Sequence, residues 1–189
     1  MSRLVVERVA ALLGPLLDEL VLVGGCATAF LVSPPNDRAL RVTDDVDYII
    51  PAFSYAEYTD WENRLRHLGF AECREEGGVI CRWMIGETRV DFMPVDGLGF
   101  HNRWYGEAVR EPESFTLESG LRVRVVNIPV FLATKFDAFG DRGGGDFFAN
   151  SDIEDVITVL AFRQDSAQLI AAAAPPVSPR ASQAIANSS

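Results

Sequence analysis

The chain has 189 residues, of which 48% are hydrophobic and 23% are charged, so it can bury one good core and is most simply one domain with short appendages. Its formal net charge of −10 argues against sequence-independent wrapping of nucleic acid, because an acidic surface repels polyanions. Binding of nucleic acid through a local basic patch stays open. Charged residues such as Glu7 and Asp18 interrupt the apolar N-terminal stretch, so we expect no signal peptide, no membrane span and a cytoplasmic location.

In the first half of the chain, helical and alternating apolar patterns follow one another, separated by glycine turns. The expected helices cover 5–16, 26–32 and 55–68, and the expected strands cover 20–23, 45–50, 79–85 and 88–93. Gly14-Pro15 should break or kink the first helix, and Gly69 should end the third. Gly24-Gly25 makes a turn after the first strand, and Gly86-Glu87 closes a hairpin.

The second half begins with another hairpin, over 115–117 and 121–126, and then changes to helices. Asn127 is a good N-cap for a helix that runs to about residue 139. Ser151 and Glu154 form a capping box that opens a helix to about residue 162. Between these two helices, the glycine-rich segment 140–145 indicates a flexible connector.

This order of elements predicts an α+β chain in three parts. Residues 1–126 would form the core that carries the sheet, and 127–164 would form C-terminal helices packed on it. Residues 165–189 pass from an Ala run into a Pro- and Ser-rich end, which predicts a short helix and a disordered tail because such a composition cannot form a core.

Three aspartates are the main candidates for chemistry. Asp45 and Asp47 alternate along one strand, so they share a face with Cα atoms roughly 6.6 to 6.8 Å apart. Asp91 lies between Val90 and Phe92, which should face the core while Asp91 faces the other side. Three neighbouring carboxylates repel one another unless a cation lies among them, and hard carboxylate oxygens favour Mg²⁺, most simply as two ions. The competing interpretation is a solvent-facing acidic edge.

The glycine pair would provide the other half of the site. Without side chains, the backbone of Gly24-Gly25 can approach a phosphate, and the following helix offers N–H donors and a favourable dipole. The alternative is a tight turn with no ligand.

The positive charge of the chain comes from sixteen Arg and a single Lys, Lys135. A chain that uses Arg elsewhere but keeps one ammonium indicates that a compact point charge is wanted there. The alternative is a compositional accident on a solvated helix face.

Other classes of function lack support in the sequence. No Walker lysine motif, no GxGxxG after a strand and no GxSxG occur, which disfavours P-loop, dinucleotide and esterase chemistry. Cys26, Cys73 and Cys81 are widely spaced, which argues against a disulfide framework and a zinc site. The aromatic segment 97–105 would either stack a base or pack as a core edge.

The motifs together resemble the DNA polymerase beta-like nucleotidyltransferase superfamily, and more closely the minimal nucleotidyltransferases of the AbiEii toxin group. Residues 22–28 (LVGGCAT) are similar to the opening motif of that group, and 43–47 (TDDVD) to its metal motif. Residues 133–136 (ATKF) with Arg142, and 151–155 (SDIED), resemble its later lysine, arginine and Asp-x-x-Asp elements.

The similarity spans roughly residues 20 to 163 and implies a nucleotidyltransferase fold, in which a mixed sheet is flanked by helices. In one respect the sequence departs from the family: nineteen residues separate Gly25 from Asp45, which makes 33–40 an insertion near the site.

The resemblance implies a role for each matched residue in the core. Asp45 and Asp47 would hold the metals, and Asp91 would bind one metal and help to deprotonate the acceptor hydroxyl. Gly24, Gly25 and Thr43 would contact the triphosphate.

The later motifs add three residues. Lys135 would neutralise phosphate charge as pyrophosphate departs, and Asp155 would orient Lys135 from the facing helix. Asp155 equally suits a helix N-terminus through the dipole, without any function. Arg142 would either reach a phosphate or be a solvated loop residue.

The resemblance therefore implies a Mg²⁺-dependent enzyme that moves an NMP from an NTP to an acceptor hydroxyl and releases pyrophosphate. As the toxin half of a toxin–antitoxin pair, it would act on RNA such as a tRNA 3′ end, with Arg122 and Arg124 as a local basic group and an antitoxin protein as partner. Two alternatives stay open: a small-molecule nucleotidyltransferase similar to aminoglycoside-modifying enzymes, and a module that binds nucleotide or protein without turnover.

Overall fold

The structure is a computed structural model that describes residues 2–33, 43, 45–73, 80–98, 102–141 and 150–173. Within these ranges, seven strands form one sheet in the order β3-β4-β5-β2-β1-β7-β6. The strands are β1 (Val21–Val23), β2 (Asp45–Ile50), β3 (Ala71–Glu72), β4 (Arg82–Ile85), β5 (Thr88–Pro94), β6 (Glu113–Thr116) and β7 (Arg122–Val125). β2 runs parallel to β5 and β1 parallel to β7, whereas the other neighbours are antiparallel. The predicted α+β chain with a mixed sheet is confirmed.

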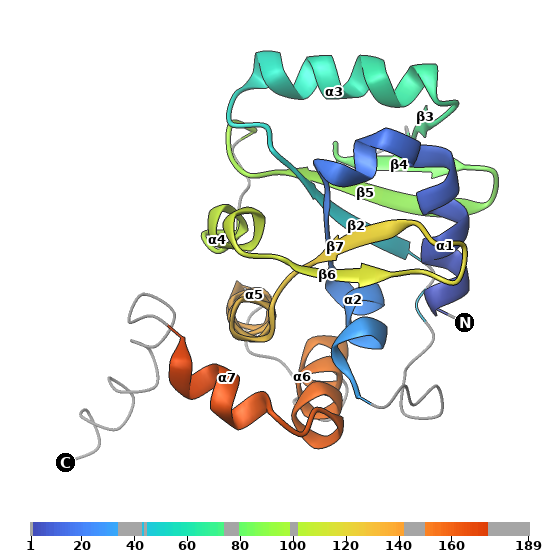
Figure 1. Ribbon diagram of the computed structural model, residues 1–189. Coiled ribbons are helices and arrows are strands. Elements are labelled where there is room, and N and C mark those ends of the chain that lie inside the picture. The colour runs from blue at the N-terminus through green and yellow to red at the C-terminus, as the bar shows by residue number, and fades with distance from the viewer. Residues whose placement is uncertain are drawn as a thin grey trace.

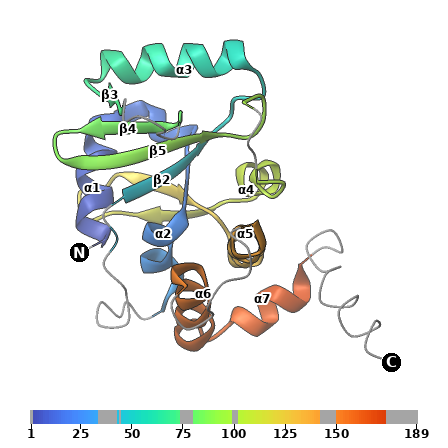
Figure 2. The same ribbon diagram turned by 180° about the vertical axis from the view of Figure 1, so that it is seen from behind.

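Seven α-helices and one 3₁₀ helix surround this sheet in the described ranges (Figure 1). They are α1 (Ser2–Leu13), the 3₁₀ helix η1 (Gly14–Asp18), α2 (Gly24–Leu31), α3 (Tyr55–His67), α4 (Tyr105–Arg110), α5 (Ile128–Asp141), α6 (Ser151–Phe162) and α7 (Ser166–Ala172). In Figures 1 and 2, α3 lies at the end of the sheet near β3 and β4, while α2, α5, α6 and α7 gather at the opposite end.

The two central strands separate apolar from acidic side chains by simple alternation. Val46 and Tyr48 of β2 and Val90 and Phe92 of β5 are all buried, and the rings of Tyr48 and Phe92 stack with their centroids 6.0 Å apart. Successive side chains of a strand point to opposite faces, so burying this set commits the odd-numbered positions to the other face. The predicted orientation of the aspartates follows from this packing.

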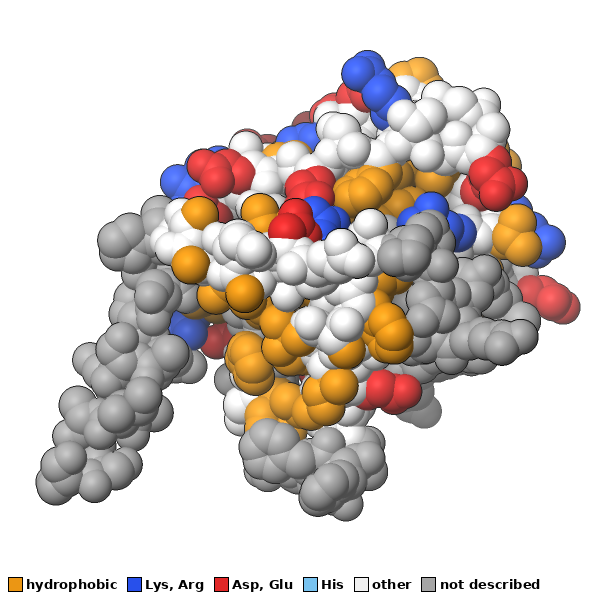
Figure 3. All heavy atoms as spheres, turned by 60° about the horizontal axis from the view of Figure 1, so that its bottom comes forward, with side chains coloured by type: hydrophobic (Ala, Val, Ile, Leu, Met, Phe, Trp, Pro, Cys, Tyr) orange, Lys and Arg blue, Asp and Glu red, His pale blue; other side chains and the backbone are white. Residues whose placement is uncertain are grey.

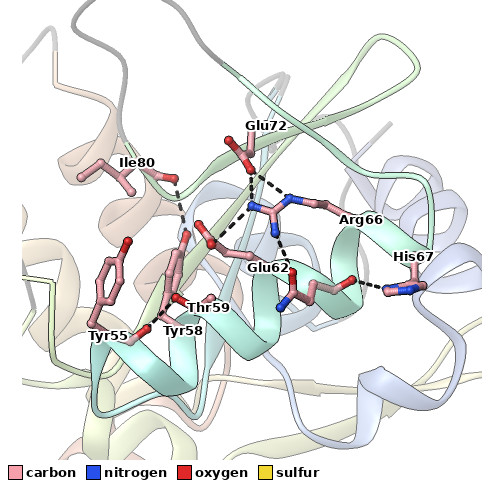
Figure 4. Close-up of polar contacts among 9 residues, drawn as sticks. Tyr55, Tyr58, Thr59, Glu62, Arg66, His67, Glu72 and Ile80 are labelled. Carbon is pink, nitrogen blue, oxygen red and sulfur yellow. Dashed lines mark hydrogen bonds and ion pairs between the residues drawn. The ribbon is translucent and has the colours of Figure 1, made fainter.

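Helix α3 is joined to the sheet edge by polar contacts that Figure 4 shows. Arg66 forms ion pairs with Glu62 on the same helix and with Glu72 on β3. The hydroxyl of Tyr58 donates to the carbonyl oxygen of Ile80 at 3.4 Å. These contacts lie at the opposite end of the sheet from α5 and α6 (Figures 1 and 2), so they support the scaffold rather than the candidate site.

Several local expectations need correction. Helix α2 begins at Gly24, two residues earlier than predicted, and helix α5 includes Gly140 and Asp141, which we assigned to the connector. The N-cap of α6 is Asn150, whose side chain accepts from the backbone of the first turn, so the predicted capping box at Ser151 is wrong. Strand β3 and helix α4 were not expected. The rest of the connector, most of the 33–40 insertion and the tail beyond 173 lie outside the described residues.

The C-terminal helices leave apolar side chains on the surface. Figure 3 shows apolar side chains gathered on the face that this view brings forward. The exposed large apolar residues of α5, α6 and α7 are Phe136, Ile157, Leu160, Phe162 and Ile170. Even so, none of the described helices combines the length and apolar character needed to cross a membrane.

Candidate metal and nucleotide site

The turn that opens α2 can be built only with glycine. Gly24 has a φ of +66°, and a Cβ added there would lie 1.9 Å from Oδ2 of Asp47. An L side chain is therefore disfavoured twice, by the backbone conformation and by the carboxylate that fills the space. The Sγ of Cys26 donates to the carbonyl oxygen of Asp45 at 3.2 Å, which ties the first turn of α2 to β2. The glycine turn and the two aspartates of β2 thus form one packed unit.

Three carboxylates meet where β2 and β5 run side by side. In the parallel register Asp47 is the partner of Asp91, and Asp45 lies two positions before Asp47 on the same strand. Each of the three offers one oxygen, and these oxygens all lie within 4.8 Å of one another. The structure therefore brings together the three acids that the sequence analysis selected.

The electrostatics of this cluster follow from its crowding. Burial, together with the charges of Asp45 and Asp91, raises the pKa of Asp47 to about 7, although the charges of Lys135 and Arg82 act in the opposite direction. Without another cation, the cluster therefore retains a proton at a pH where an ordinary aspartate has lost it. Carboxylate oxygens this close are a donor set for a hard divalent cation, so the residues present fit Mg²⁺.

One residue at this site, Arg82 on β4, was not predicted from the sequence. Its Nε donates to Oδ1 of Asp91 at 2.9 Å, and its Nη2 donates to Oδ2 at 2.8 Å. The hydrogen bonds to Asp91 raise the pKa of Arg82 further above its ordinary value. The predicted hairpin around Gly86-Glu87 already places position 82 opposite 91, because Ile85 pairs with Thr88 in the same antiparallel ladder. The signal was present in the register of that turn.

Lys135 lies on α5 and is buried, with only 7% of its side chain exposed. Its Nζ donates to Oδ1 of Asp152 at 3.0 Å and to Oδ2 of Asp155 at 2.7 Å, both on α6. We expected the contact with Asp155 but not the one with Asp152. The interpretation of Lys135 as a residue on a solvated helix face is wrong, because the residue is buried. The charge of Lys135 acts to lower the pKa of Asp47.

Solved structures with the same architecture have been found. One is an antigenic nucleotidyltransferase-like protein from Paracoccidioides brasiliensis, which is 18% identical, with a TM-score of 0.54 over 98% of this chain and 91% of that one. Another is the antibiotic-resistance factor ANT(2'')-Ia, also 18% identical, with a TM-score of 0.50 over 98% of this chain and 94% of that one. The chain has the nucleotidyltransferase fold. No protein-family model matches the sequence, and neither does any curated protein.

Within this nucleotidyltransferase fold, the other predicted site residues have different surroundings. Gly25 is buried in the first turn of α2. Thr43 is buried, and its Oγ1 has no hydrogen-bond partner in the part of the chain that the structure describes. Arg142 lies outside the described residues. Of the two arginines expected to approach RNA, Arg122 is exposed, whereas Arg124 donates to backbone carbonyl oxygens, those of Asp18 and Val109.

The aromatic segment beside the site serves as a packed edge. The hydroxyl of Tyr105 contacts the Sδ of Met93 at 2.9 Å, and Arg103 pairs with Asp137 of α5 at 3.2 Å. Met93 lies two positions after Asp91, so it belongs to the same face of β5. These contacts favour the core-edge interpretation for the described part of the segment.

Proposed function

We propose that this chain is a Mg²⁺-dependent nucleotidyltransferase, which moves an NMP from an NTP to an acceptor hydroxyl and releases pyrophosphate. The observation that supports it best is the convergence of Asp45, Asp47 and Asp91, whose oxygens lie within 4.8 Å of one another beside the turn at Gly24. A cluster of mutually repelling acids is costly in a fold that has no use for a cation there.

In this proposal each acid has a defined part. Asp45, Asp47 and Asp91 would hold two Mg²⁺ ions. Bound Mg²⁺ would supply positive charge against the charge that develops on the transferred phosphoryl group. Asp91 would accept the proton of the acceptor hydroxyl, whose oxygen then bonds to the α-phosphorus while the bond to pyrophosphate breaks. Gly24 and Gly25 would present backbone N–H groups of the first turn of α2 to the triphosphate.

The remaining predicted residues would act on the triphosphate. Lys135, held by Asp152 and Asp155, would contribute positive charge from a fixed position as pyrophosphate leaves. Thr43 would offer its buried hydroxyl to a phosphate oxygen, and Arg142 would add a second cation.

The finer proposal concerns the acceptor and the biological role. On the motifs that resemble the AbiEii group, we propose a cytoplasmic toxin that acts on RNA such as tRNA and is paired with an antitoxin protein. The second candidate is transfer to a small hydroxyl compound. Three observations favour it: the net charge of −10, the use of the Arg124 guanidinium for internal contacts, and the likeness in fold to an antibiotic-resistance factor.

The test uses the full chain, NTPs labelled at the α-phosphate, Mg²⁺, and either total tRNA or a panel of small hydroxyl compounds. We compare the wild type with Asp47→Ala and with Asp60→Ala, which removes an exposed aspartate of α3 as a matched control. The wild type and Asp60→Ala should transfer label. The transfer activity of Asp47→Ala should fall more than about 100-fold, which exceeds the usual cost of removing a residue that only orients a metal ligand. Label in tRNA selects the toxin, and label in a small product selects the second candidate.

Equal transfer by Asp47→Ala would contradict the proposal. Metal-dependent nucleotide binding by the wild type, without transfer to any acceptor, would favour the non-catalytic module instead.

A further inference from the structure

The guanidinium of Arg82 donates hydrogen bonds to both carboxylate oxygens of Asp91, at 2.9 and 2.8 Å. We propose that Arg82 is a positioning residue, which sets the plane of the Asp91 carboxylate so that its remaining acceptor sites face the cation site. The inference rests on the proposed function, because it concerns the same three acids. It adds a residue on a strand that contributes none of them.

The strand register makes this contact part of the scaffold. Arg82 and Asp91 are direct partners in the antiparallel β4–β5 pair, and Asp91 and Asp47 are direct partners in the parallel β5–β2 pair. The three side chains therefore form a row across three adjacent strands on one face of the sheet. A rotation of the Asp91 carboxylate would have to break two hydrogen bonds at once.

The chemistry of the two groups allows the guanidinium and a cation to share one carboxylate. Each carboxylate oxygen has two acceptor positions, so a fork that uses one on each oxygen leaves one on each. Only 24% of the Arg82 side chain and 11% of the Asp91 side chain are exposed, so water competes little for these positions. Partners of this kind orient metal ligands in many sites, and their loss typically costs about 10–100-fold in metal affinity or activity.

A different role for Arg82 would have the opposite consequence. If it acted only as a counter-charge that occupies Asp91 until a cation displaces it, its removal would tighten cation binding, because one competing positive charge would be gone. If it positions Asp91, its removal weakens cation binding. The sign of the change in affinity separates the two roles.

The experiment measures Mn²⁺ binding by the electron paramagnetic resonance signal of the free ion. Wild type, Arg82→Lys and Arg82→Met are titrated at about pH 8.5, above the pKa of about 7 of Asp47. Arg89→Met is the matched control, because Arg89 is an exposed residue of β5 opposite Asp45 and its removal changes the charge near the site without touching the fork. Both Arg82 variants should bind Mn²⁺ about 10–100-fold more weakly, and Arg89→Met should stay within about threefold of the wild type.

Arg82→Lys protects the test against misfolding, because it keeps the charge and loses only the fork. Thermal melting of each variant confirms that the titrated chain is folded. Unchanged or tighter Mn²⁺ binding by Arg82→Lys and Arg82→Met would overturn the inference.

The proposed function fails in a distinguishable way. If the wild type binds Mn²⁺ no better than Asp47→Ala and transfers no label, the nucleotidyltransferase proposal falls, and the role of Arg82 falls with it. If the wild type binds Mn²⁺ and transfers label, and the Arg82 variants do so equally well, only the positioning role is wrong.

Discussion

Two acidic clusters in this molecule differ in how their carboxylates are paired: the aspartate triad of Asp45, Asp47 and Asp91, and the Lys135 cluster of Lys135, Asp152 and Asp155. In the first, Asp45, Asp47 and Asp91 face one another, and the only arginine or lysine that forms an ion pair with them in the described residues is Arg82, which contacts Asp91. In the second, Asp152 and Asp155 converge on the ammonium of Lys135. The first cluster has an excess of acids that repel one another, whereas the second is built around its own cation.

The difference shows what each cluster can do. In the Lys135 cluster both carboxylates accept from one ammonium, which holds α5 against α6. In the aspartate triad, burial and the charges of Asp45 and Asp91 raise the pKa of Asp47, so the triad is destabilised until a cation or a proton reduces the repulsion. The aspartate triad is therefore the better candidate for a metal site, and the Lys135 cluster is the better candidate for a structural support that also fixes the position of its ammonium.

Removing the ammonium of the Lys135 cluster should have the largest effect on stability. Lys135→Met leaves two buried aspartates without their ammonium and should lower the free energy of unfolding by about 3–5 kcal/mol. Urea unfolding measures this change. Arg110→Met, which breaks an exposed pair with Glu107 on one helix, should cost less than about 1 kcal/mol. Similar losses for the two variants would show that the Lys135 cluster is not a buried support.

The aspartate triad should make the stability of the metal-free protein sensitive to pH. The pKa of Asp47 is raised from 3.8 to about 7, so the folded chain holds this proton more tightly than the unfolded chain does. The stability that this group contributes is complete below about pH 4 and is lost as the pH rises through about 7. Since one pKa unit corresponds to about 1.4 kcal/mol, the rise from 3.8 to about 7 sets the upper limit of the loss at roughly 4 kcal/mol.

Asp47→Asn tests this prediction because it removes the titrating group and keeps the shape. Unfolding by urea in the presence of EDTA should show that the wild type loses stability between about pH 4 and pH 7 while the variant loses much less. Mg²⁺ should restore the wild type at the higher pH. The same pH dependence in both proteins would mean that the repulsion is relieved in some other way.

A methyl group at the glycine turn should damage the site more than the fold. Gly24→Ala forces a left-handed conformation on an L residue, at about 1–2 kcal/mol, and directs its Cβ at the Asp47 carboxylate. Gly86→Ala is the matched control, because Gly86 has a φ of +57° and nothing lies within 4 Å of an added Cβ. Transfer activity should fall more than about 100-fold in Gly24→Ala and stay near that of the wild type in Gly86→Ala. Equal transfer activity in the two variants would show that the turn at Gly24 does not contribute to the site formed by the three aspartates.

The smallest effect concerns the N-cap of α6, the helix that carries Asp152 and Asp155. Asn150 accepts from the N–H groups of Asp152 and Ile153 at 2.8 and 3.3 Å, so Asn150→Ala should cost about 1 kcal/mol of stability. Ser151→Ala at the next position should cost less, because Asn150 and not Ser151 is the N-cap. Differential scanning calorimetry measures both changes. A larger loss of stability for Ser151→Ala than for Asn150→Ala would support the capping box predicted from the sequence.

Elements with a strong local pattern were predicted from the sequence, and elements without one were not. The alternation of apolar and acidic residues predicts a strand over 45–50, and β2 has these bounds. Strand β3 has two residues, too few for any periodicity to indicate it. Helix α4 has six residues, fewer than two turns, and Gly106 is the second of them, so its sequence gave no helical period.

The sequence by itself determined which side chains share a face, because alternation along a strand and the need for glycine at a turn are properties of adjacent residues. It thereby selected Asp45, Asp47, Asp91 and Gly24 as candidates. Only the tertiary structure decided that β5 lies beside β2 and that Asp152 shares Lys135 with Asp155. These contacts join segments far apart in the chain, and the pKa of Asp47 depends on burial, which arises only when those segments pack together.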